Sequence, residues 1–168
     1  MKVRQTLRYV AGPKLVGLML VSPDFQQTVL TFLHASECSV AASDDRVTTV
    51  FVTPTDRLLR QVATSWSRHI GEFSWVTPYE NDARFGNLTF RTEHFPATLD
   101  ARVTLVHEYG VTTIDYDADF YLNVPVLGEA VERVMADGVI EHLALYQPLG
   151  ERWLRDHGVD HPEPPPVF

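Results

Sequence analysis

The sequence has a single cysteine, Cys38, among its 168 residues. One cysteine excludes an intramolecular disulfide, and we therefore favour a reducing, cytoplasmic location. Positive charge is also scarce, because 14 Lys and Arg stand against 22 Asp and Glu, for a formal net charge of -8. Nucleic acids and anionic membranes attract clustered Lys and Arg. Neither is therefore an expected partner.

Long apolar runs are absent as well. The run LVGLMLV at 15–21 follows several basic residues, as in a signal peptide, but it is short, Gly12 and Pro13 precede it, and no small-residue cleavage site follows. No run approaches the roughly 20 residues that a helix needs to cross a bilayer. We predict neither secretion nor stable membrane insertion.

The common sequence motifs of nucleotide-binding proteins and hydrolases are missing too. The chain has no GxGxxG or GxxxxGK loop for phosphates and no GxSxG elbow of a hydrolase. His157 and His161 have the spacing of helical zinc ligands, but Gly158 and the Pro-rich end that follows would break that helix. A catalytic triad assembles in space and stays open at this stage. We expect no metal and no cofactor.

What the chain does contain is the pattern of one α+β domain. Strands are expected at 2–10, 36–43, 46–53, 72–79, 85–94, 99–108 and 111–124, and helices within 12–21 and 22–35 and from 126 onward. In residues 57–70 the apolar side chains from Leu59 to Ile70 have helical spacing, which predicts a helix lying across the sheet. An apolar sheet face must be covered, and the C-terminal helix is the only element long enough to cover it.

Three stretches carry a resemblance to a known superfamily: SPDF at 22–25, GNLTFRTEHFPATLDARVTL at 86–105 and TIDYDADFYLNVPVLGEAVERVM at 113–135. Through them the chain resembles the START-like (SRPBCC) helix-grip proteins, which include the birch-pollen allergen and polyketide cyclase and lipid-transfer-like domains. Within that superfamily it is most similar to an actinobacterial domain of unknown function. The resemblance implies a cavity between sheet and final helix that often holds hydrophobic ligands, and it carries over no catalytic residues.

Pattern and resemblance together predict the fold class. We expect a helix-grip domain over residues 1–157, with a curved antiparallel sheet of about six or seven strands wrapped around a long C-terminal helix and two short helices after the first strand. The Pro-rich segment 158–168 is expected to be a disordered tail.

Three aspartates, Asp115, Asp117 and Asp119, share one face of the last strand, as hard ligands of a divalent cation would. The two-residue turn Tyr109-Gly110 predicts the register of this strand with the one before it. That register pairs Arg102 with Asp117, Thr104 with Asp115, Leu105 with Ile114, Val103 with Tyr116 and Leu99 with Phe120. Because Arg102 then partly neutralises the cluster, a solvated outer face is favoured over a metal site.

The final helix places His142 in the middle of its apolar stripe, with Gly138 one turn earlier. A buried imidazole must find a partner or stay neutral. Tyr116, a threonine or a backbone carbonyl could satisfy it inside a filled core. Alternatively, it anchors a ligand that uses the room left at Gly138. Pro148 is expected to kink the helix or make it restart.

The favoured function is a binding or carrier protein for a hydrophobic small molecule, lipid-like or polyketide-like. Its expected ligand-binding residues are Phe51, Trp66, Phe73, Trp75, Phe90, Val103, Leu105, Tyr116, Phe120, Val131, Met135, Gly138, His142 and Tyr146. One alternative is a small cyclase- or hydrolase-type enzyme that uses His142, Tyr116 and His107 as acid–base groups. Another is a protein-interaction module whose cavity is collapsed and whose partner binds the acidic exterior.

Overall fold

The computed structural model describes residues 1–54, 66–93, 95–123 and 128–158, and it confirms the predicted architecture. The strands are β1 (Lys2–Tyr9), β2 (Ser36–Ser43), β3 (Arg46–Pro54), β4 (Trp66–Trp75), β5 (Ala83–Thr92), β6 (Ala97–Glu108) and β7 (Val111–Leu122). The helices are α1 (Pro13–Val21), α2 (Pro23–Phe32) and α3 (Gly128–His157). All neighbouring strands are antiparallel, in the order β1-β7-β6-β5-β4-β3-β2.

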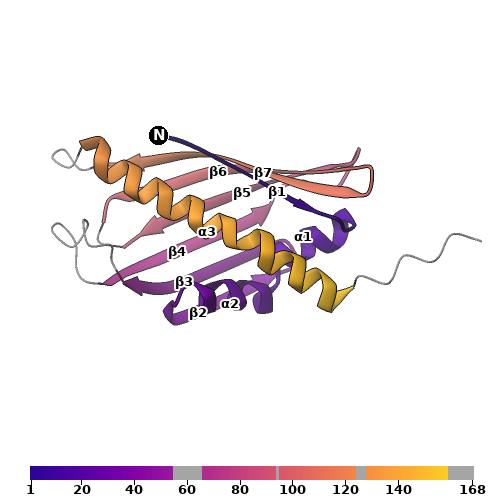
Figure 1. The fold of residues 1–168 in the computed structure, drawn as a ribbon, viewed down its shortest axis with the longest axis horizontal. Coiled ribbons are helices and arrows are strands. Elements are labelled where there is room, and N and C mark those ends of the chain that lie inside the picture. The colour runs from indigo at the N-terminus through magenta and orange to yellow at the C-terminus, as the bar shows by residue number, and fades with distance from the viewer. Residues whose placement is uncertain (55–65, 94, 124–127, 159–168) are drawn as a thin grey trace, which may run out of the picture.

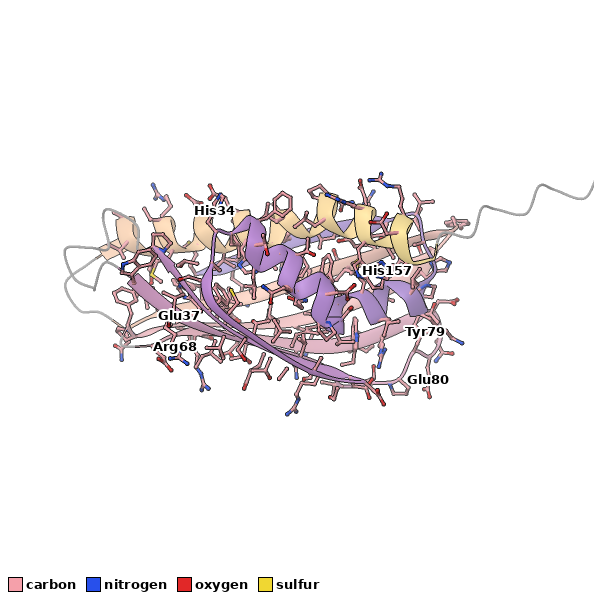
Figure 2. The ribbon with its side chains drawn as sticks, turned by 90° about the horizontal axis from the view of Figure 1, so that it is seen from below. His34, Glu37, Arg68, Tyr79, Glu80 and His157 are labelled. Carbon is pink, nitrogen blue, oxygen red and sulfur yellow. The ribbon has the colours of Figure 1, made fainter. Side chains whose placement is uncertain are left out.

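The helices of the fold lie on one face of the sheet. Helix α3 crosses one face of the sheet diagonally (Figure 1). Strands β1 and β2 are the two edges of the sheet, so α1 and α2 carry the chain from one edge to the other. Seen after a quarter turn, α3 and the sheet form two layers, and α1 and α2 lie on the same side of the sheet as α3 (Figure 2). Within the described residues, no helix is long and apolar enough to cross a membrane.

The hairpin of β6 and β7 has the predicted register in every pair, including Arg102 with Asp117 and Val103 with Tyr116. Its turn residues have positive φ, 52° at Tyr109 and 78° at Gly110, as a type I′ turn requires. This turn fixes which side chains face α3, because a slip of one residue would reverse the faces of the strand.

The three aspartates of β7 lie on the face of the sheet opposite α3, where β1 supplies their partners. The ammonium of Lys2 lies 3.0 Å from Asp119, and the guanidinium of Arg4 lies 3.4 Å from Asp117. The hydroxyl of Thr6 donates to Asp115 at 2.5 Å. These contacts match the solvated outer face that the sequence favours, with the carboxylates bonded to neighbouring side chains.

Prolines start both short helices. Pro13 and Pro23 each take the first helical position, where a missing N–H costs little. Ser22 holds the N-cap position of α2 with an extended backbone, but its hydroxyl bonds the carboxylate of Asp24 instead of a backbone N–H. That carboxylate also accepts from the indole N–H of Trp153 at 2.9 Å, and so links the start of α2 to the end of α3.

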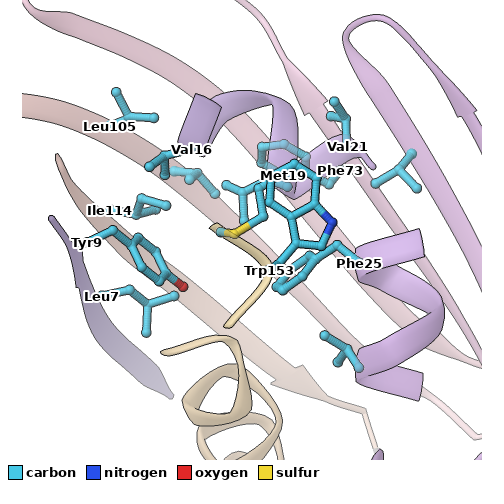
Figure 3. Packing of buried hydrophobic residues seen from close by; sticks show 14 of the residues in the cluster. Leu7, Tyr9, Val16, Met19, Val21, Phe25, Phe73, Leu105, Ile114 and Trp153 are labelled. Carbon is cyan, nitrogen blue, oxygen red and sulfur yellow. The ribbon is translucent and has the colours of Figure 1, made fainter. Parts of the chain in front are cut away.

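The largest core cluster joins β1, both short helices, the sheet and the C-terminal half of α3 (Figure 3). Its fully buried side chains include Tyr9, Phe25 and Met19. A second cluster gathers Val3, Phe95, Ala97, Leu99, Ala101, Ala118, Phe120 and Ala136. Together the two clusters hold α3 on the sheet.

The predicted helix over 57–70 is wrong where the structure describes it. β4 begins at Trp66, and residues 66–70 pair with β3 and β5. The inward face of this part of β4 carries Ser67, His69 and Gly71, which are small or polar, so the strand's alternation is hidden in the sequence. Residues 57–65 lie outside the described residues, as do 159–168 of the predicted tail.

Helix α3 runs as one 30-residue helix with Pro148 inside it, so the helix does not restart there, and the kink expected as the other outcome stays a prediction. Close packing holds this part of the helix on β1. The hydroxyl of Tyr9 donates to the carbonyl of Tyr146 at 2.5 Å, and a Cβ at Gly150 would lie only 2.6 Å from that hydroxyl oxygen. Only glycine lets the tyrosine approach the helix this closely.

Candidate ligand-binding site

A cavity of about 440 Å³ lies between the sheet and α3. Its floor is formed by residues of β3, β4, β5, β6 and β7, and its roof by α3 from Val134 to Tyr146. One side is formed by Gln26 and Leu30 of α2 and by Leu33, which directly follows that helix. Its walls include members of both core clusters, so it lies between them. A volume of this size is in the range of small-molecule sites.

Most of the predicted ligand-binding residues do line this cavity: Phe51, Phe73, Phe90, Tyr116, Phe120, Met135, Gly138, His142 and Tyr146. The aromatic rings approach one another around His142. Its ring centroid lies 6.1 Å from Phe51, 6.2 Å from Phe90 and 5.8 Å from Tyr146. A Cβ at Gly138 would meet nothing within 4 Å, so the space beside this position is open.

The other predicted residues lie elsewhere. Trp75, Val103 and Leu105 face inward but belong to the packed core, beyond the cavity. Val131 is buried near the start of α3 and is also outside the cavity wall.

Trp66 was expected to face inward on a crossing helix, and this is wrong. As the first residue of β4 it lies on the outer face and is 56% exposed. His107 is not in the cavity wall either, because it sits near the β6–β7 turn, where its Nδ1 lies 3.0 Å from the hydroxyl of Thr112. It is not brought together with His142 and Tyr116.

The most informative residue that the sequence analysis missed is His69 of β4. Its ring lines the cavity and stacks on Phe90, with centroids 5.2 Å apart. Both ring nitrogens are engaged, Nε2 at 2.8 Å from the hydroxyl of Thr53 and Nδ1 at 3.0 Å from that of Thr92. The alternation of Phe73 and Trp75, continued backward along the strand, was the signal that places His69 inside.

Several other polar groups in the wall are also bonded to protein. The hydroxyl of Tyr146 donates to Gln26 at 2.9 Å, and the amide of Gln26 donates to the carbonyl of Leu20 at 2.7 Å. The hydroxyl of Thr49 points to the carbonyl of Gly71 at 3.4 Å. These groups help to hold the wall in place and have little donor capacity left for a ligand.

Two wall groups, by contrast, have no hydrogen-bond partner among the described residues: the hydroxyl of Tyr116 and the imidazole of His142. Tyr116 is 3% exposed. Since every fully enclosed polar side-chain atom of the described residues has a partner, the Tyr116 oxygen must be open to the cavity. Of the two sequence interpretations of His142, the one in which Tyr116, a threonine or a carbonyl satisfies the ring is therefore not met by the described residues.

The titratable groups that the structure describes inside the cavity are uncharged at neutral pH. Burial lowers the pKa of His69 to about 4, and burial together with the neighbouring His69 lowers the pKa of His142 to about 4. Burial raises the pKa of Tyr146 to about 12 and that of Tyr116 well above its ordinary value. The site can therefore stack on rings and form neutral hydrogen bonds. Among the described residues, no group of three His, Cys, Asp or Glu side chains could hold a metal ion.

Comparison with known proteins supports the fold. The sequence pattern of a family described as "Protein of unknown function (DUF2505)" matches residues 4–154. No curated protein matches the chain significantly.

Solved structures with the same fold cover nearly the whole chain. The protein TTHA0849 from Thermus thermophilus is 19% identical with a TM-score of 0.60, over 94% of this chain and 100% of that one. A START superfamily protein from Mycobacterium smegmatis is 18% identical with a TM-score of 0.53, over 94% and 99%. Ara h 8.0201 is 9% identical with a TM-score of 0.51, over 87% and 96%. The fold is thus the START-like helix-grip fold.

Proposed function

The chain belongs to the DUF2505 family and has the START-like fold, and from this premise and its cavity we propose that it binds and carries an apolar small molecule between the sheet and α3. One observation carries the proposal. The cavity has aromatic and aliphatic walls, yet it also presents the unpartnered Tyr116 hydroxyl and His142 imidazole. Leaving such groups without a partner is unfavourable unless a ligand or water bonds them.

The pKa values support binding over catalysis. A general base works best when its pKa lies near the working pH. The pKa of both cavity histidines lies near 4, so at neutral pH each is a weak base. His107, the third acid–base candidate, lies outside the cavity wall.

The open cavity also bears on the interaction-module alternative. If the protein were an interaction module of that kind, side chains would fill the space between sheet and helix. The described residues enclose about 440 Å³ instead.

The proposal is tested by blocking the cavity without changing its chemistry. Val139 lines the cavity, whereas its neighbour Ile140 is 37% exposed and does not. We expect Val139→Phe to fill part of the space and to weaken binding of the uncharged fluorescent probe N-phenyl-1-naphthylamine at least fivefold. Ile140→Phe adds the same ring outside and is the matched control.

The measurement is a fluorescence titration of the full chain, with thermal melting to verify that both variants fold. Wild type and Ile140→Phe should bind the probe with a single saturable site. If wild type does not bind it, or if both phenylalanine variants bind it as tightly as wild type, the cavity is not the ligand site and the proposal fails.

A further inference from the structure

The charges around the cavity are all of one sign in the described part of the chain. Two ionised side chains line it, Asp137 and Glu141, and no lysine or arginine among the described residues does so. Both carboxylates are exposed and flank Gly138 on α3. Since Gly138 and Pro54, also in the wall, are exposed as well, these residues mark the rim at which the cavity meets solvent.

Arg68 lies next to lining residues of β4 in the sequence, but it does not offset the negative charge of the cavity rim. Its neighbours Ser67 and His69 line the cavity. Because side chains alternate along a strand, Arg68 points to the outer face, where its guanidinium lies 3.6 Å from Glu93.

The described residues of the interior offer no positive charge either. Because burial lowers the pKa of His69 and His142 to about 4, both imidazoles are neutral at pH 7. The unpartnered groups, Tyr116 and His142, can still bond a hydroxyl or carbonyl oxygen. A buried anion, however, would lose its hydration and gain no opposite charge, which is strongly unfavourable.

Building on the proposed function, we infer that the cavity selects uncharged ligands and rejects those carrying a carboxylate, sulfonate or phosphate, and that Asp137 and Glu141 set this selectivity at its rim. The preferred ligand is a neutral amphiphile, an alcohol or ketone with an apolar or aromatic body. Free fatty acids and phospholipids are excluded by the same argument.

Two probes with one skeleton test this inference. N-phenyl-1-naphthylamine is uncharged, and 8-anilino-1-naphthalenesulfonate is the same molecule with a sulfonate added. We expect the anionic probe to bind the full chain at least tenfold more weakly at pH 7. Binding counts as cavity binding where Val139→Phe weakens it and Ile140→Phe does not.

A charge-matched pair of variants tests the rim. Asp137→Asn with Glu141→Gln removes two carboxylates from the rim, and Glu129→Gln with Asp156→Asn removes two exposed carboxylates from the same helix away from the cavity. The rim variant should narrow the difference in affinity between the two probes at least threefold, because the anionic probe binds more tightly once the two carboxylates are removed. The control variant should show the same difference in affinity between the two probes as wild type.

The outcomes separate the two proposals. If both probes bind the wild-type cavity equally well, selection against anions is overturned and the carrier function stands. If neither probe binds, the carrier function falls and this inference falls with it. If the wild-type cavity rejects the anionic probe but the rim variant shows the same difference in affinity between the probes, Asp137 and Glu141 do not set the selectivity.

Discussion

Two buried tyrosines show how differently the same hydroxyl is used in this molecule. The Tyr9 hydroxyl donates to a backbone carbonyl of α3, whereas the Tyr116 hydroxyl has no partner in the described structure and faces the cavity. The first therefore contributes to folding. The second is available for a ligand.

This difference predicts opposite effects of removing the two oxygens. Tyr9→Phe should lower the free energy of unfolding by about 1 to 2 kcal/mol, because it leaves a carbonyl without its partner. Tyr116→Phe should change it by less than about 0.5 kcal/mol, because no protein hydrogen bond is lost. Denaturant unfolding of the two variants checks the prediction, and a Tyr116→Phe variant as destabilised as Tyr9→Phe would mean that its hydroxyl is bonded in the protein.

The two cavity histidines make stability depend on pH. Their pKa lies near 4 in the fold and near 6.5 in the unfolded chain, so the unfolded chain binds protons more readily between these values. The contribution of the two neutral imidazoles to the free energy of unfolding is complete above pH 6.5 and falls as the pH drops. It stops falling below about pH 4. At the lower end of this pH range, each imidazole should account for a loss of about 2 to 3 kcal/mol of unfolding free energy.

Variants isolate this effect from the carboxylates that titrate in the same range. His142→Gln should lose less unfolding free energy than wild type between pH 7 and pH 4, by about 2 to 3 kcal/mol. His34→Asn changes an exposed histidine and should follow the wild-type curve. Parallel curves for wild type and His142→Gln would show that His142 is not held neutral by burial.

At the scale of elements, α3 carries two glycines in opposite surroundings. A Cβ at Gly150 would collide with the ring and hydroxyl of Tyr9, whereas one at Gly138 would meet nothing within 4 Å. Gly150→Ala should therefore destabilise the fold by about 1 to 3 kcal/mol. Gly138→Ala should stabilise it by about 0.5 to 1 kcal/mol through helix propensity.

Thermal melting of the two alanine variants checks this pair. The same substitution in the same helix controls for propensity, so the difference between the variants reports the contact with Tyr9. A Gly150→Ala variant as stable as Gly138→Ala would contradict the close packing of β1 on α3.

Elements were predictable where local rules determine them. The turn residues Tyr109 and Gly110 are enough to set the whole β6–β7 register, and the prolines mark the starts of α1 and α2. β4 was misread because its inward positions carry Ser67, His69 and Gly71, so the apolar residues that remain have helical spacing by chance. The same misreading hid His69 from the predicted site.

For the whole molecule, the architecture followed from the sequence, but which inward side chains leave the implied cavity open did not. Phe51, Phe73 and Phe90 line the cavity while Trp75, Val103 and Leu105 fill the core, although all six have similar inward positions on their strands. Trp75, for example, is covered by α1, where its indole N–H donates to the carbonyl of Gly17 at 3.0 Å. Such packing is between segments far apart in the sequence. A sequence pattern shows which face is apolar and does not show where the space between two faces stays open.

The central claim is that this open space holds a small apolar molecule. The most direct test is a native mass spectrum of the freshly purified full chain, compared with Val139→Phe as the blocked variant and Ile140→Phe as its control. The account predicts a complex heavier than the polypeptide by one small molecule for wild type and Ile140→Phe, reduced for Val139→Phe and dissociating at raised collision energy. Bare polypeptide alone in all three spectra, together with no binding of N-phenyl-1-naphthylamine, would contradict it.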